Sequence, residues 1–71
     1  MGSAAERLGK NVRAARLERG WTQEDLAHAA GLAVPQISRI ERGKREVRLT
    51  TLLQLAAALE LRPDELLDGL F

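Results

Sequence analysis

The sequence contains no cysteine and no tyrosine, and only one tryptophan, one phenylalanine and one histidine among its 71 residues. Without cysteine the chain has neither a disulfide framework nor a thiolate metal site. The one histidine, His28, has no second histidine with which to share a metal ion, and we expect it to face solvent. The sequence therefore predicts no metal site, no cofactor, no small-molecule ligand and no catalytic residue.

Long apolar runs are also missing. A membrane-spanning helix needs about 20 predominantly apolar residues, and no stretch of this sequence approaches that length. The first ten residues, MGSAAERLGK, lack the apolar segment of a secretion signal. We expect neither a membrane protein nor a secreted one, and a cytoplasmic location.

The composition that remains favours helices, because 45% of the residues are hydrophobic and most of these are leucine and alanine. The length predicts one domain over residues 1–71. The net charge is only +1, but residues 1–48 carry a balance of +4 and residues 49–71 one of −3. A basic first part suggests a surface that meets a polyanion, although an ordinary solvated surface would account for the charges equally well.

Residues 21–43, WTQEDLAHAAGLAVPQISRIERG, predict two short helices joined by a sharp turn. Thr22 is a favoured N-cap residue, and Asp25 three positions later completes an acidic capping box. Gly31 is the residue type that ends a helix in the left-handed conformation. Two helices joined in this way match the helix-turn-helix of DNA-binding proteins.

The same segment resembles the Cro/C1-type (XRE) helix-turn-helix family of phage repressors and small bacterial regulators. The likeness is carried by Gln23, Leu26, Ala27, Gly31, Ile37, Ser38, Ile40, Glu41 and Gly43, and it extends over residues 8–20 and 49–67. The resemblance implies an all-α, five-helix lambda-repressor-like domain whose second and third helices form the helix-turn-helix. Among small members, the chain is most similar to restriction-modification controller proteins and phage Cro-like repressors.

Periodicity and capping residues predict helices over residues 4–19, 23–30, 35–42, 49–59 and 63–70. Val34 precedes a proline, which disfavours helical backbone, so the third helix is expected to begin at Pro35. Leu49 is expected on the core-facing side of the fourth helix.

The family resemblance implies that the start of the third helix reaches DNA bases. Val34 and Pro35 cannot hydrogen-bond a base through their side chains, but they can pack against the methyl group of thymine. Polar readout then falls to Gln36, Ser38 and Arg39, with a contact to the DNA backbone alone as the alternative for Ser38. Arg39 is the best candidate for guanine, with a phosphate clamp as the alternative, and Gln36 is left open between adenine and a phosphate.

Contacts to the DNA backbone are implied around that helix. In the family the glutamine at the position of Gln23 contacts the backbone, and the loop corresponding to residues 43–48 straddles it. Such contacts hold register without reading sequence. The candidate phosphate contacts are Thr22, Gln23, Arg42, Lys44, Arg45 and Arg48.

Two features of the first helix point to close helix packing. In the family a basic residue at the position of Arg16 pairs with an acid at the end of the recognition helix, which here is Glu41. The alternative is two independent surface charges. Gly9 costs the helix up to about 1 kcal/mol of intrinsic propensity, and close packing against another helix would explain it.

The C-terminal part holds more apolar residues than one small core needs, and family members often dimerise through this end. The expected homodimer contacts are Leu53, Leu67, Leu70 and Phe71. A dimer would place two copies of the third helix in successive major grooves, about 34 Å apart. The favoured hypothesis is a sequence-specific regulator that binds double-stranded DNA. An antitoxin or protein-interaction module, or a detached domain of a larger regulator, remains an alternative.

Overall fold

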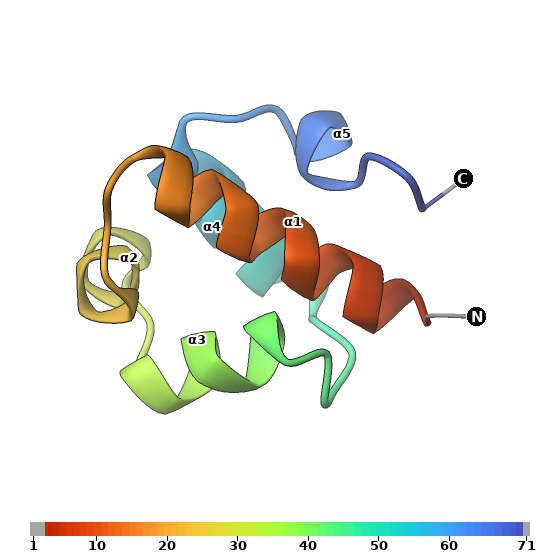
Figure 1. Cartoon of the computed structure of the whole chain (residues 1–71), viewed down its shortest axis with the longest axis horizontal. Coiled ribbons are helices and arrows are strands. Elements are labelled where there is room, and N and C mark those ends of the chain that lie inside the picture. The colour runs from red at the N-terminus through yellow and green to blue at the C-terminus, as the bar shows by residue number, and fades with distance from the viewer. Residues whose placement is uncertain (1–2, 71) are drawn as a thin grey trace.

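The computed structural model describes residues 3–70, and all regular secondary structure in this part of the chain is helical. The helices are α1 (Ala4–Glu18), α2 (Gln23–Ala30), α3 (Val34–Glu41), α4 (Leu49–Leu59) and α5 (Pro63–Leu66). In Figure 1, α1 crosses the front of the molecule with α4 behind it, α2 and α3 lie to the left and below, and α5 lies above. This arrangement confirms the predicted all-α, five-helix fold. Within residues 3–70 no helix has the length and apolar character needed to cross a bilayer.

All five helices contribute to a single hydrophobic core. Its most deeply buried side chains are Val12, Leu26, Ile37, Leu55, Leu59 and Leu66. Leu49 does not join them, contrary to expectation, because its side chain is 70% exposed at the first turn of α4. The leucines of α4 keep their helical spacing through its first turn, but the core does not reach that turn.

Gly9 marks the place where α1 meets the end of α3. A Cβ atom at this position would lie 2.8 Å from the carbonyl oxygen of Glu41, and it would also collide with the carbonyl of Ile40. The two backbones can approach this closely only because residue 9 has no side chain, which explains a glycine inside a helix.

Four of the five helices begin with the same hydrogen bond. In each, the side chain three positions after the N-cap residue accepts from the backbone N–H of that N-cap residue, and this satisfies a donor that the helix leaves free. The donor–acceptor pairs are Ser3–Glu6 at 3.0 Å, Thr22–Asp25 at 2.8 Å, Ala33–Gln36 at 2.9 Å and Arg62–Glu65 at 2.9 Å. At the first of these, the Ser3 backbone N–H holds the pKa of the Glu6 carboxyl below its ordinary value.

The third helix begins at Val34, one residue earlier than predicted. Ala33 is the N-cap residue and takes the extended conformation that was predicted for Val34. Pro35 then occupies the first turn, where its missing N–H has no intrahelical partner to lose. The Gln36 side chain accepts from the Ala33 N–H, whereas the alanine methyl group cannot accept from a first-turn N–H as a polar N-cap side chain would.

The last helix is shorter than predicted and ends at Leu66 rather than near Leu70. Gly69 leaves the helical path in the left-handed conformation at φ +82°, and Nδ2 of Asn11 in α1 donates to the carbonyl oxygens of Leu66 and Asp68 at 2.9 and 2.7 Å. These carbonyls are therefore satisfied without a continuing helix. The first helix also ends one residue early, with Arg19 as its C-cap.

Candidate nucleic-acid interface

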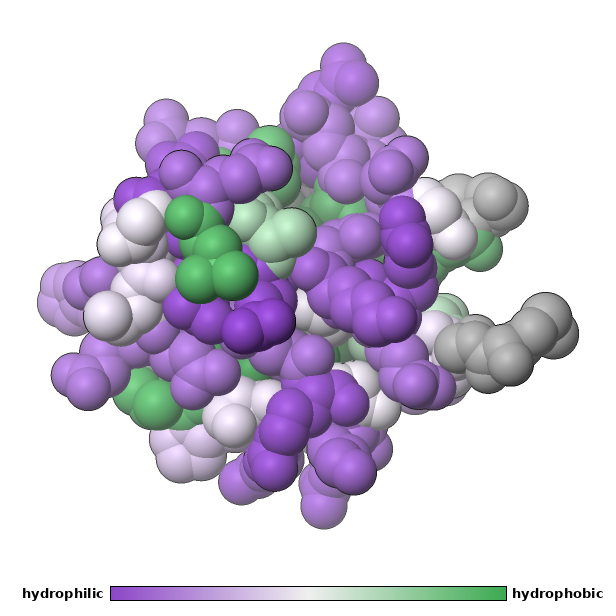
Figure 2. Space-filling model, in the orientation of Figure 1, coloured by the Kyte–Doolittle hydropathy of each residue, from purple (hydrophilic) through white to green (hydrophobic). Residues whose placement is uncertain are grey.

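The two faces of α3 have opposite character. Ile37 and Ile40 are buried in the core, whereas Pro35, Gln36 and Arg39 are exposed and Val34 is 37% exposed. Figure 2 shows hydrophilic side chains projecting along the lower edge of the molecule, where α3 and the following loop lie in Figure 1. Of the predicted base-contact residues, only Ser38 is half-buried. The side of α3 that carries the predicted base contacts, which we call the reading face, is therefore exposed to solvent. The opposite side of the helix is packed against the core.

A hollow of about 350 Å³ lies between α3 and the loop over residues 43–48. We call it the basic hollow. Its lining includes three guanidinium groups but a single carboxylate, so it carries net positive charge and is suited to an anionic group such as phosphate. The residues that line it are Gln36, Arg39, Ile40, Arg45, Glu46, Val47, Arg48 and Thr51.

The predicted phosphate contacts fall at the start of α2 and around the basic hollow. Lys44, Arg45 and Arg48 are exposed and lie in the loop, as the sequence argument placed them. The Arg42 Nε donates to the carbonyl oxygen of Ser38 at 3.3 Å, which holds this guanidinium beside the last turn of α3. The Thr22 hydroxyl accepts from the Asp25 N–H at 3.1 Å, and it keeps its own proton as a donor.

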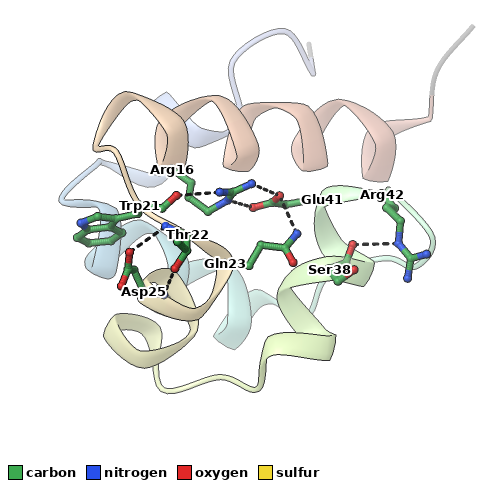
Figure 3. A network of polar contacts seen from close by, with 8 residues as sticks. All are labelled: Arg16, Trp21, Thr22, Gln23, Asp25, Ser38, Glu41 and Arg42. Atoms are coloured by element: carbon green, nitrogen blue, oxygen red, sulfur yellow. Dashed lines mark hydrogen bonds and ion pairs between the residues drawn. The ribbon is translucent and has the colours of Figure 1, made fainter.

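A buried polar network behind α3 joins three helices (Figure 3). Arg16 donates from Nε to Glu41 Oε2 at 2.7 Å and from Nη2 to Glu41 Oε1 at 3.0 Å. The two side chains are only 10% and 4% exposed. The bond to Glu41 raises the pKa of Arg16 above its ordinary value. This is the bidentate pair that the family resemblance implied, and it fixes α1 against the end of α3.

Two members of this network were not anticipated. Gln23 Nε2 donates to Glu41 Oε1 at 3.2 Å, so the residue expected to contact phosphate also ties α2 to the buried carboxylate. The Trp21 carbonyl oxygen accepts from Arg16 Nη1 at 2.8 Å. A carboxylate can accept more than two hydrogen bonds, so Glu41 could be expected to have a donor besides Arg16. The sequence held no other indication of this donor.

The expected dimer residues do not share one environment. Leu53 on α4 is 47% exposed. Leu67 and Leu70 are half-buried and line an apolar groove of about 240 Å³ beside Ala4 and Leu8. Phe71 lies outside the described residues. Part of the apolar surface at this end therefore covers the chain's own core, and Leu53 is the most exposed of the described candidates.

Comparison with known proteins places this geometry in a family. A family model described as helix-turn-helix matches residues 12–66. The chain is 38% identical over 63 residues to the HTH-type transcriptional regulator DdrOP3 of Deinococcus deserti, covering 89% of this chain and 49% of that protein. It is 42% identical over 62 residues to the control protein C.SmaI of Serratia marcescens, covering 87% of this chain and 74% of that one.

A solved structure shows the same fold. The restriction-modification controller protein C.AhdI from Aeromonas hydrophila superposes with a TM-score of 0.84 at 39% identity, covering 87% of this chain and 94% of that one. The chain spans only about half the length of the Deinococcus regulator. The matched region includes α2, α3 and the buried pair between Arg16 and Glu41. The chain therefore belongs to the Cro/C1-type (XRE) helix-turn-helix family of transcription regulators, which bind DNA and are not enzymes.

Proposed function

We propose that this chain binds double-stranded DNA sequence-specifically as a homodimer, with α3 of each copy in the major groove of a two-fold symmetric operator. The observation that carries the proposal is the exposed face of α3, which offers Gln36 and Arg39 beside the basic hollow. The similarity to C.AhdI and C.SmaI, named as controller or control proteins, supports a small regulator of this kind. A bacterial transcription regulator acts on DNA in the cytoplasm, so the proposal carries the cytoplasmic location expected from the sequence.

Two basic residues have different tasks in this proposal. Arg39 lies on the exposed face of α3, and its guanidinium matches the O6 and N7 acceptors of guanine. Lys44 lies in the loop after α3 and contributes a charge to phosphate. Val34 and Pro35 add apolar contacts to thymine methyl groups, and Ser38 adds a donor close to the bases. Thr22, Gln23, Arg42, Arg45 and Arg48 complete the backbone contacts.

The Arg39→Ala variant tests this division of tasks against Lys44→Ala. Bound duplexes are first selected from a random pool, and affinities are then measured for the selected site and its single-base variants. Arg39→Ala is expected to lose about 1–3 kcal/mol of discrimination at one base pair of each half-site. Lys44→Ala is expected to weaken binding to all sequences evenly and to reduce the slope of log affinity against log salt by about one.

The two variants control for each other because each removes one positive charge. Equal weakening on every duplex by Arg39→Ala would make Arg39 a phosphate contact. The absence of any preferred duplex for the wild-type chain would contradict the proposed function itself. A selected site without two-fold symmetry would contradict the dimer.

The dimer has its own test in Leu53→Glu, with Leu17→Glu as the matched control. Both leucines are about half exposed, at 47% and 52%, but Leu17 lies on α1 outside the proposed interface. A two-fold interface contains residue 53 twice, so the variant would bury two uncompensated carboxylates. Sedimentation equilibrium is expected to show dimerisation weakened by at least about tenfold for Leu53→Glu and unchanged for Leu17→Glu. Equal association of the two variants would remove Leu53 from the interface.

A further inference from the structure

The orientation of the Gln36 carboxamide is fixed by the start of α3. Its Oε1 accepts from the backbone N–H of Ala33 at 2.9 Å. Within the carboxamide only the oxygen can accept from this N–H, because the NH₂ group is a donor. The amide therefore cannot be flipped while this bond exists. The Nε2 group is therefore the free end of the side chain, and it has no hydrogen-bond partner within residues 3–70. On an exposed residue of the reading face, this leaves two N–H donors available to a ligand.

The choice of an amide at this position is unusual within the chain. At the corresponding position of α1, α2 and α5 the acceptor is a carboxylate, from Glu6, Asp25 and Glu65. A carboxylate is the stronger acceptor, and the positive end of the helix dipole favours it. Gln36 in α3 therefore provides a weaker cap than this chain uses elsewhere. Helix stability alone therefore does not explain the amide at this position.

The surroundings of Gln36 indicate a reason for the amide. Gln36 lines the basic hollow together with Arg39, Arg45 and Arg48. A carboxylate at residue 36 would neutralise part of this charge and repel a phosphate. The amide keeps the same capping bond without negative charge, and it adds a hydrogen-bond donor that a carboxylate lacks.

We propose that Gln36 is a specificity-determining residue that reads guanine by donation from Nε2, while its Oε1 continues to cap α3. This inference rests on the proposed function, because it requires α3 in the major groove. Adenine is read by glutamine through a pair of bonds that uses Oε1 as well as Nε2, and here the Ala33 N–H already engages one of the two lone pairs of Oε1. Guanine offers two neighbouring acceptors, O6 and N7, and no donor between them. The bond to Ala33 thus favours reading through the two unpaired N–H donors of Nε2, which suit the two acceptors of guanine.

The first test compares the wild-type chain with Gln36→Met, which has a similar length and no polar atom. Each is measured on the selected operator and on duplexes with guanine changed to adenine at each position in turn. For the wild type, one guanine per half-site is expected to lose about five- to tenfold in affinity on this change, as one hydrogen bond allows. For Gln36→Met, the same change is expected to have little effect, while preferences at the other positions remain.

The second test uses Gln36→Glu, which keeps the capping acceptor and removes the donor. Its urea midpoint is expected to equal or exceed that of the wild type, whereas Gln36→Met should unfold at lower urea. Because a free carboxylate oxygen accepts from the N4 amino group of cytosine, selection with Gln36→Glu is expected to replace guanine by cytosine at the same position. Protection of the Ala33 amide from hydrogen exchange in the DNA complex reports directly on the cap.

The outcomes separate this inference from the proposed function. A wild-type chain that selects adenine at the position sensitive to Gln36, with the Ala33 amide losing protection on binding, would overturn the inference and leave the function standing. So would an unchanged selection by Gln36→Met. If the wild-type chain selects no duplex at all, both the proposed function and this inference fail.

Discussion

Replacing Glu41 with glutamine is expected to reduce the free energy of unfolding by about 3–5 kcal/mol, as breaking a buried ion pair does. The variant keeps the shape of the side chain but leaves the Arg16 guanidinium buried, 10% exposed, without an opposite charge. The hydrogen bond from Gln23 to Oε1 also loses its charged acceptor. A domain of this size has a free energy of unfolding of roughly 4–10 kcal/mol. Urea unfolding followed by circular dichroism therefore measures a large fraction of the total.

The double variant Arg16→Met with Glu41→Leu tests whether the loss of stability comes from the unpaired charge of Arg16. Replacing both partners by apolar residues removes the charge together with its counter-charge, and such replacements are often neutral or stabilising. The double variant is therefore expected to be more stable than Glu41→Gln, even though it has lost more hydrogen bonds. An exposed pair serves as the control, since Arg62→Ala, next to Asp64, should change stability by less than about 0.5 kcal/mol. If the double variant were less stable than the single one, the pair would act as a net stabilising bond.

The same comparison bears on DNA binding. Arg16, Glu41 and Gln23 hold α1, α2 and α3 together from behind, on the side of α3 opposite its exposed face. The pair thereby couples the orientation of the reading helix to the rest of the fold. This coupling is one physical reason to retain a buried ion pair, because such pairs often add little net stability over apolar replacements.

The features that sequence reasoning predicted well are those determined by neighbouring residues. The start of α2 follows from Thr22 and Asp25, and its end follows from Gly31, which adopts φ +70° as its C-cap. The bounds of α2 and α4 were predicted to the residue. The buried partner of Arg16 lies 25 positions away and came from the family resemblance, since spacing alone allowed two independent surface charges.

The features that sequence reasoning missed depend on contacts between distant segments. The end of α5 involves Asn11, whose hydrogen bonds span more than fifty residues of sequence, together with the left-handed conformation of Gly69. The exposure of Leu49 depends on where the core ends, and periodicity carries no information on that point. The orientation of the Gln36 amide is a local exception, because it depends on Ala33, three residues earlier, as the N-cap residue of α3, a position that the sequence prediction gave to Val34. The DNA contacts themselves stay predictions because they depend on a partner molecule.

Gly9→Ala sets two effects against each other. Alanine has the higher intrinsic helix propensity, so in an open helix this change would stabilise the fold by about 1 kcal/mol. At residue 9 the new Cβ atom would meet the backbone carbonyls of Ile40 and Glu41, which cannot rotate aside as a side chain can. Overpacking of this kind costs about 3 kcal/mol. We therefore expect a net loss of about 2 kcal/mol, with α3 displaced from α1 and affinity for the operator reduced.

Ala14→Gly provides the matched control for the propensity effect. Ala14 is exposed in the same helix, so its replacement measures the difference between alanine and glycine in α1 without a packing contribution. The control should be destabilised by about 1 kcal/mol, and Gly9→Ala should be destabilised as well, although it makes the opposite change. The two urea midpoints would decide the matter. If Gly9→Ala were stabilised by the amount that Ala14→Gly loses, then α1 and α3 would lie further apart in solution, and the close approach that positions the reading helix would not exist.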